Sequence, residues 1–112
     1  MTPEMPAPTC TVRFDDRNIQ CEYSDGRTER ITWESLQEVL IRTLDAGLSF
    51  TDIFWVLMGS SAQCIIPHGS EGDSALLERL QKLPGFNNDV FIAAMSSISD
   101  GEFVCWRRPA QS

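Results

Sequence analysis

The sequence has little lysine and histidine and no long apolar run. Of its 112 residues, 9 are basic and 16 are acidic, which gives a net charge of −7. A chain this acidic lacks the basic surface that neutralises phosphates, so we expect no nucleic acid among its partners. No apolar stretch reaches the roughly 18 residues of a membrane-spanning helix, so we expect no membrane span.

The first residues lack the features of a secretory signal. Residues 1–8 contain three prolines, no basic residue and no apolar run. We therefore interpret 1–8 as an extended tail and expect the protein in the cytoplasm.

The spacing of the cysteines also excludes familiar sites. They stand at positions 10, 21, 64 and 105, and no two are separated by two residues, which excludes zinc-knuckle and thioredoxin-type spacing. The even count is compatible with two disulfides, but buried free thiols are the expectation for a cytoplasmic chain. We expect no metal and no cofactor.

The hydrophobic pattern predicts one α+β domain over residues 9–108, followed by a short tail at 109–112. Alternation and β-prone composition predict strands, with turns between them. The expected strands are 11–14, 19–23, 27–33, 39–43, 52–58, 63–67 and 102–107. One helical turn is expected at 34–37, and the run at 52–58 is apolar enough to be buried on both faces.

A change of period after residue 70 predicts two helices. Leu76, Leu77, Leu80 and Leu83 form one stripe after an acidic capping cluster at 70–74. A second stripe begins after a capping cluster at 87–89. Because strands come first and helices later, we expect a curved antiparallel sheet of about six to seven strands, with two helices of the C-terminal half packed on it. By element order this is analogous to a pleckstrin-homology-like barrel.

Most of the chain resembles a group of small bacterial proteins to which no activity is assigned. The resembling segments are Ile31–Trp33, Leu36, Val39–Ile41, Thr43–Asp45, Gly47, Asp52–Leu57, Ile65–Pro67, Leu76–Leu80, Leu83–Phe86, Ala94–Met95 and Phe103–Trp106. Where those relatives carry a longer acidic turn, this chain keeps only Asp45 and Gly47. The resemblance implies a shared fold and no particular activity.

The sequence contains no convincing catalytic motif. A strand would hold Cys64 and His68 about 13 Å apart, too far for a thiol–imidazole pair. The segment 59–61 lacks the second glycine of a nucleophile elbow.

Acidic residues gather in the middle of the chain. Asp45 and Asp52 flank one connection and could face each other as an acid–base pair or a cation site, although a solvated acidic rim is the simpler interpretation.

Two groups of residues are candidates for a partner surface. Trp106, Arg107 and Arg108 stand together near the C-terminus, and Trp and Arg dominate interface energetics. Leu48 and Phe50 are apolar residues in an expected connection. Either group could instead pack on the sheet.

We therefore weigh three functions. The first is a non-catalytic protein-binding module, such as an acidic immunity-type inhibitor that covers a basic partner through a surface containing Asp45 and Asp52. The second is a small-molecule or lipid pocket, and the third, least supported, is a small hydrolase-like enzyme using those carboxylates or Cys64. A homodimer through a sheet edge is compatible with all three.

Overall fold

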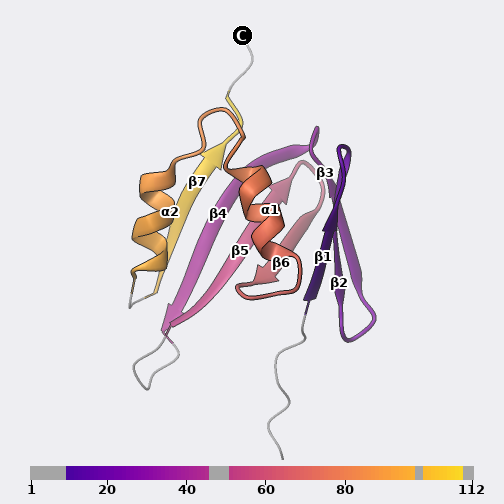
Figure 1. The fold of residues 1–112 in the computed structure, drawn as a ribbon, viewed down its shortest axis with the longest axis horizontal. Helices are drawn as coiled ribbons and strands as arrows, with labels where there is room; N and C mark the ends of the chain where they lie inside the picture. Colours follow the sequence, from indigo (N-terminus) through magenta and orange to yellow (C-terminus); the bar gives the residue numbers. More distant parts are fainter. Residues whose placement is uncertain (1–9, 46–50, 98–99, 110–112) are drawn as a thin grey trace, which may run out of the picture.

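A computed structural model describes residues 10–45, 51–97 and 100–109 (Figure 1). These residues form seven strands and two helices. In chain order the elements are β1 (Cys10–Phe14), β2 (Asn18–Tyr23), β3 (Thr28–Thr32), β4 (Leu36–Asp45), β5 (Thr51–Gly59), β6 (Gln63–Pro67), α1 (Asp73–Leu80), α2 (Asn88–Met95) and β7 (Gly101–Arg107). The α+β class and the strands-then-helices order are as expected, while residues 1–8 lie outside the described part.

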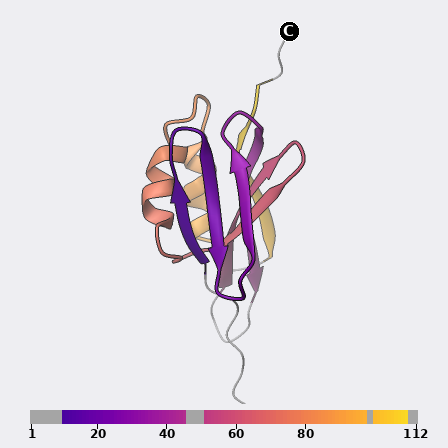
Figure 2. The same ribbon diagram turned by 90° about the vertical axis from the view of Figure 1, so that its right-hand side faces the viewer.

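The strands form two antiparallel sheets, so the expectation of one curved sheet was wrong. One sheet has the order β1-β2-β3 and the other the order β6-β5-β4-β7. Figure 2 shows the three-stranded sheet in front of the longer strands, which run across behind it. The chain leaves β3 at a turn over residues 33–35, and β4 pairs with β5 and β7 instead of returning beside β3. The described residues form no closed barrel.

The helical turn expected at 34–37 is also absent. Leu36 and Gln37 already belong to β4, and the preceding turn is closed by the Ser35 N–H, which donates to the Thr32 carbonyl at 3.1 Å. Leu36 is completely buried. The pairing of β4 with β5 shifts register between Leu36 and Glu38, and this irregularity lets Leu36 share the inward face with Val39 and Ile41, which are also fully buried.

Both predicted helices are present, with different caps. The Asn87 side chain caps α2 by accepting the Val90 N–H at 3.1 Å. At α1 the N-cap is Gly72, at φ 89°, and no side chain caps the helix. The Asp73 carboxylate instead accepts the Gly69 N–H at 2.7 Å and closes the loop before the helix.

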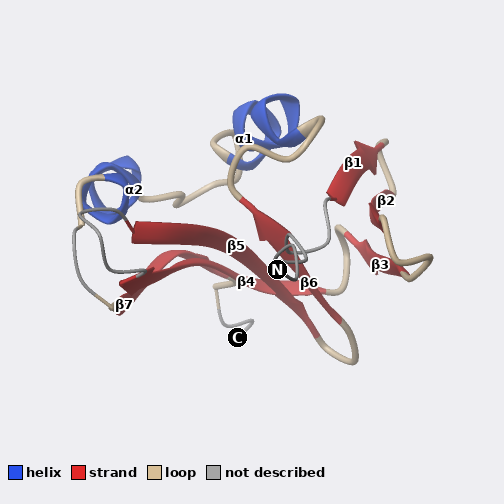
Figure 3. Ribbon diagram, turned by 90° about the horizontal axis from the view of Figure 1, so that it is seen from below, coloured by secondary structure: helices blue, strands red, loops and turns tan. Residues whose placement is uncertain are grey.

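Both helices lie on the same side of the four-stranded sheet, as Figure 3 shows. The core lies between this sheet, the helices and the three-stranded sheet. Trp55 of β5 stacks on Phe91 of α2 with 5.6 Å between ring centres. Leu76 and Leu80, from the predicted stripe, are buried beneath α1.

The two sheets meet at a layer of thiols and one tyrosine. All four cysteines are free and buried, as the sequence predicted. The hydrogen bond with Cys64, together with burial, raises the pKa of the Cys21 thiol. The Tyr23 hydroxyl lies 2.6 Å from both Glu29 Oε1 and the Ile65 carbonyl oxygen, so it links β2 to β6. Burial, followed by the hydrogen bond to Glu29, raises the pKa of Tyr23.

Candidate docking surface

The face of the four-stranded sheet that points away from the helices is largely apolar. We call it the open face. Alternate residues of the four strands line a hollow of about 400 Å³ there. They are Leu40, Arg42 and Leu44 of β4, Phe54, Val56 and Met58 of β5, Gln63 and Ile65 of β6, and Glu102 of β7. In Figure 3 no described helix or strand covers this face of the sheet.

The side chains at the rim of the hollow are substantially exposed. Leu44, Met58 and Ile65 are 39%, 37% and 41% exposed, whereas Leu40 and Val56 beneath them are buried. The expectation that 52–58 would be buried on both faces was therefore wrong in part. The inward residues Trp55 and Leu57 are buried, but the alternate residues face the hollow, because both helices lie on the other side.

One basic side chain, that of Arg42, stands inside this apolar surface without a partner among the described residues. Arg42 is exposed, and no ion pair or hydrogen bond of its side chain is found in the part of the chain that the structure describes. Its cross-strand neighbours in register are Phe54 and Glu102. The Glu102 carboxylate likewise forms no ion pair with any described residue. Within the described part of the chain, the open face thus presents an unpaired guanidinium and an unpaired carboxylate beside apolar groups.

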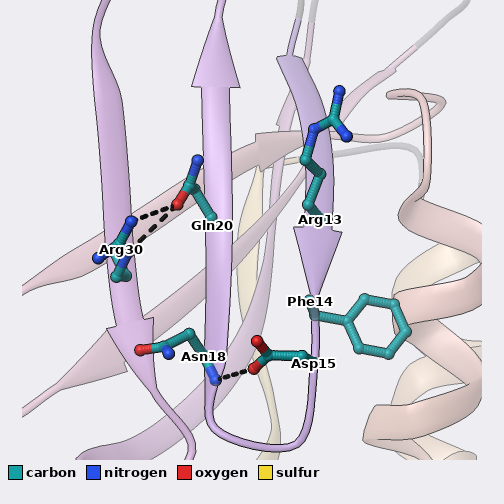
Figure 4. A pocket seen from close by; sticks show the side chains of 6 residues that line it. All are labelled: Arg13, Phe14, Asp15, Asn18, Gln20 and Arg30. Atoms are coloured by element: carbon teal, nitrogen blue, oxygen red, sulfur yellow. Dashed lines mark hydrogen bonds between the residues drawn. The ribbon is translucent and has the colours of Figure 1, made fainter.

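The outward face of the three-stranded sheet has the opposite character. We call it the polar face; its side chains include Arg13, Gln20, Glu22, Thr28 and Arg30. Figure 4 shows the side chains that line a hollow on this face, where the Arg30 guanidinium donates twice to Gln20 Oε1. Arg13 pairs with Glu22 at 3.3 Å. These side chains satisfy one another at the surface.

The acidic pair suggested by the sequence is only partly described. Asp45 and Asp52 lie on adjacent strands, with register partners Asp45↔Thr51 and Leu44↔Asp52. The Asp52 side chain is exposed. Leu48 and Phe50, and the side chain of Asp45, lie outside what the structure describes. The role of these residues in binding stays a prediction.

The C-terminal candidates make contacts within the fold. Trp106 is only 5% exposed, and its indole N–H donates to the Pro84 carbonyl at 2.9 Å. The Arg108 guanidinium donates to three carbonyls of the turn before and into β4, those of Trp33, Glu34 and Leu36. These contacts fix the end of β7 to the loop after α1 and to the turn before β4.

Arg107 is the exposed member of that group. It pairs with Glu38 at 2.9 Å, across from β7 to β4. A partner role for Trp106, Arg107 and Arg108 stays a prediction.

Cys64 and His68, the residues considered for catalysis, differ in their exposure to solvent. Cys64 is fully buried, whereas the His68 side chain is 52% exposed and lies 3.9 Å from Asp73. Within the described ranges, no group of three or more His, Cys, Asp or Glu residues could hold a metal ion. Neither described helix is long and apolar enough to cross a membrane.

Comparison of the chain with protein-family models, with curated proteins and with solved structures finds no match. The resemblance to small bacterial proteins therefore stays an expectation.

The hydrophobic pattern of the sequence alone does not predict the open face. A signal was present in the alternation of Leu40, Arg42 and Leu44 and in the pair Ile65 and Met58. Two helices of eight residues each are too short to cover both faces of four strands, since each extends only about 12 Å. The short length of the helices therefore predicts that one face of the four-stranded sheet is left uncovered.

Proposed function

We propose that the protein is a non-catalytic protein-binding module that docks its partner on the open face. The observation that carries this proposal is the apolar hollow that crosses all four strands. Contiguous exposed apolar surface is uncommon on monomeric proteins and marks sites of interaction. The polar face of the same protein shows the ordinary surface pattern, in which polar side chains pair with one another.

The composition of the open face defines the partner's chemistry. Apolar side chains form its centre, and Arg42 and Glu102 supply one charge of each sign. A matching surface needs apolar side chains opposite this centre, with an acid opposite Arg42 and a base opposite Glu102. The net charge of −7 adds a long-range field that would speed the approach of a basic partner, as in the acidic inhibitor version of this function.

A small-molecule pocket is the second candidate, supported by the volume of the hollow. A volume of about 400 Å³ falls within the range of ligand sites, and Arg42 could pair with a carboxylate on an apolar ligand. Such sites normally enclose most of their ligand, whereas this hollow lies open across a sheet. A native mass spectrum with a retained ligand would favour this second function.

The proposal is tested with a matched pair of variants. Ile65→Glu places a charge on the open face, and Thr28→Glu places the same charge at an exposed strand position of the polar face. We expect wild type and Thr28→Glu to retain the same specific protein, and Ile65→Glu to lose it, in capture from lysate followed by mass spectrometry. Equal capture by all three proteins would remove the open face as the binding surface.

A further inference from the structure

We infer that the open face binds the open face of a second copy of this chain, forming a two-fold symmetric dimer. This inference rests on the proposed function, because it names the occupant of the same surface. A two-fold interface brings one patch against itself, so the patch must be complementary to itself. The charges and the size of the open face meet that condition.

The charged side chains at the open face can pair across a two-fold axis. Arg42 and Glu102 are unpaired within the described part of one copy, although they are register partners on adjacent strands. In a symmetric pair, Arg42 of each copy can meet Glu102 or Asp52 of the other. Two equivalent ion pairs then flank the apolar centre and fix the orientation of the copies.

The open face carries little of the protein's net charge. Arg42 carries one positive charge there and Glu102 and Asp52 carry two negative ones, while Glu38 and Arg107 pair with each other at one end of β4 and β7. The face therefore has near balance between acids and bases, whereas the whole chain carries −7. Two copies can thus approach face to face with most of their like charge directed elsewhere.

The area of the face is sufficient for a reversible dimer. Strands of 5 to 10 residues, with about 3.3 Å per residue and about 4.8 Å between strands, give a face of roughly 500 Å². Two copies would bury about 1,000 Å², at the lower limit for a specific interface. Two twisted sheets pack in this way about 10 Å apart, with strands near −30°.

The edges of the same sheet are already occupied at specific points. The Ile65 carbonyl of β6 accepts from the Tyr23 hydroxyl, and the Cys105 carbonyl of β7 accepts the Asn87 N–H at 2.7 Å. Strand addition at either edge would have to displace these bonds. The face offers contact without that loss, so it is favoured over the edge for self-association.

The dependence of binding on salt concentration distinguishes a second copy from a basic partner. Copies of charge −7 repel one another at long range, and salt screens this repulsion. The dimer should therefore tighten by several-fold between about 50 mM and about 500 mM salt. Binding to a basic protein would weaken over the same range.

The test is sedimentation equilibrium of the purified full chain over a wide concentration range. We expect a monomer–dimer equilibrium that Ile65→Glu weakens by at least about 100-fold, with Thr28→Glu close to wild type. Circular dichroism checks that each variant is folded. If Ile65→Glu does not fold, Ile65→Thr keeps a β-branched residue and should still weaken the dimer by about 10-fold.

A charge exchange tests the orientation of the two copies. Arg42→Glu and Glu102→Arg should each weaken the dimer about 10-fold, and the double variant should recover most of the loss. A protein that stays monomeric at about 1 mM, or a dimer that Ile65→Glu leaves intact, would overturn the inference. If the chain is monomeric but Ile65→Glu still abolishes capture of another protein, the proposed function stands and only its occupant changes.

Discussion

The open face and the polar face are the two outward surfaces of the two antiparallel sheets. On the polar face, Arg30 pairs with Gln20 and Arg13 with Glu22. On the open face, Met58 and Ile65 are more than a third exposed and Arg42 has no partner among the described residues. Since strand geometry is the same in both sheets, the difference reflects what each face contacts. The polar face is satisfied by its own pairs and by water. Each exposed apolar side chain of the open face is already about three-fifths buried, so covering the rest would contribute on the order of 1 kcal/mol.

The three-stranded sheet is also joined to the loop that precedes α1. The Val12 N–H of β1 donates to the Glu71 carbonyl at 2.7 Å, just before the helix. At Gly72, with φ 89°, an added methyl group would collide with the Val12 carbonyl oxygen. The largest predicted effect is therefore at this glycine. Gly72→Ala should destabilise the protein by roughly 3 kcal/mol or more, measured by urea denaturation.

Gly85 provides the matched control for this substitution. It has φ 88°, but an added β-carbon would meet no atom within 4 Å. Gly85→Ala should cost only the backbone strain of about 1–2 kcal/mol. Equal losses at the two glycines would show that the contact with Val12 does not hold the sheets together.

The buried thiols between the sheets should make the folded protein less stable at high pH. Burial raises the pKa of the Cys105 thiol to about 11, from about 9 when unfolded. Because the folded state favours the protonated thiol, its stability is complete below pH 9 and falls as the pH rises toward 11. The loss from this group is about 2–3 kcal/mol at pH 11.

Denaturation under reducing conditions between pH 8 and pH 11 measures this slope, with the window set by the same pKa. In the Cys105→Ala variant, the free energy of unfolding should fall less steeply with pH above pH 9, whatever the absolute stability of the variant. An unchanged slope would show that this thiol does not titrate differently on unfolding. The other buried groups with raised pKa, Cys10, Cys21 and Tyr23, would contribute the slope that remains.

The link between the sheets at Tyr23 should have a smaller effect. Tyr23→Phe removes the hydroxyl that contacts both Glu29 and the Ile65 carbonyl. The expected loss is about 1–3 kcal/mol by urea denaturation at neutral pH, because the Ile65 carbonyl loses its side-chain donor. Glu29→Gln keeps the contact with Ile65 and should cost less. If Glu29→Gln costs as much as Tyr23→Phe, the bond to Ile65 contributes nothing.

Local chemistry made much of the fold predictable from the sequence. Strict alternation defined β2, Gly26 in the predicted turn has φ 95°, and Asn87 caps α2. The division into two sheets depends on non-local pairing, which alternation does not encode. Leu36 illustrates this limit, since its burial follows from which strand β4 joins.

The candidate surface was less predictable than the fold. Alternation along 52–58 places Val56 and Trp55 on opposite faces of the sheet, but it does not indicate which face the helices will cover. An apolar residue therefore has the same sequence signature in a core and on a docking face. Trp106 shows the converse case, because a residue type favoured in interfaces packs in the core here and its indole N–H donates to the Pro84 carbonyl.

The smallest predicted effect concerns the turn beside the polar face, and it should appear in acid rather than in alkali. The Asp15 carboxylate accepts the Asn18 and Arg17 N–H groups at 2.7 and 2.8 Å, and these bonds lower its pKa below 3.8. Asp15 therefore stabilises the fold above pH 3.8, and this contribution is lost as the pH falls through the lowered pKa. Asp15→Asn should lower the melting temperature slightly at pH 7, and the difference from wild type should shrink toward pH 2. Asp16→Asn changes the same charge without those backbone bonds, so an equal shift from both substitutions would assign the effect to net charge rather than to the turn.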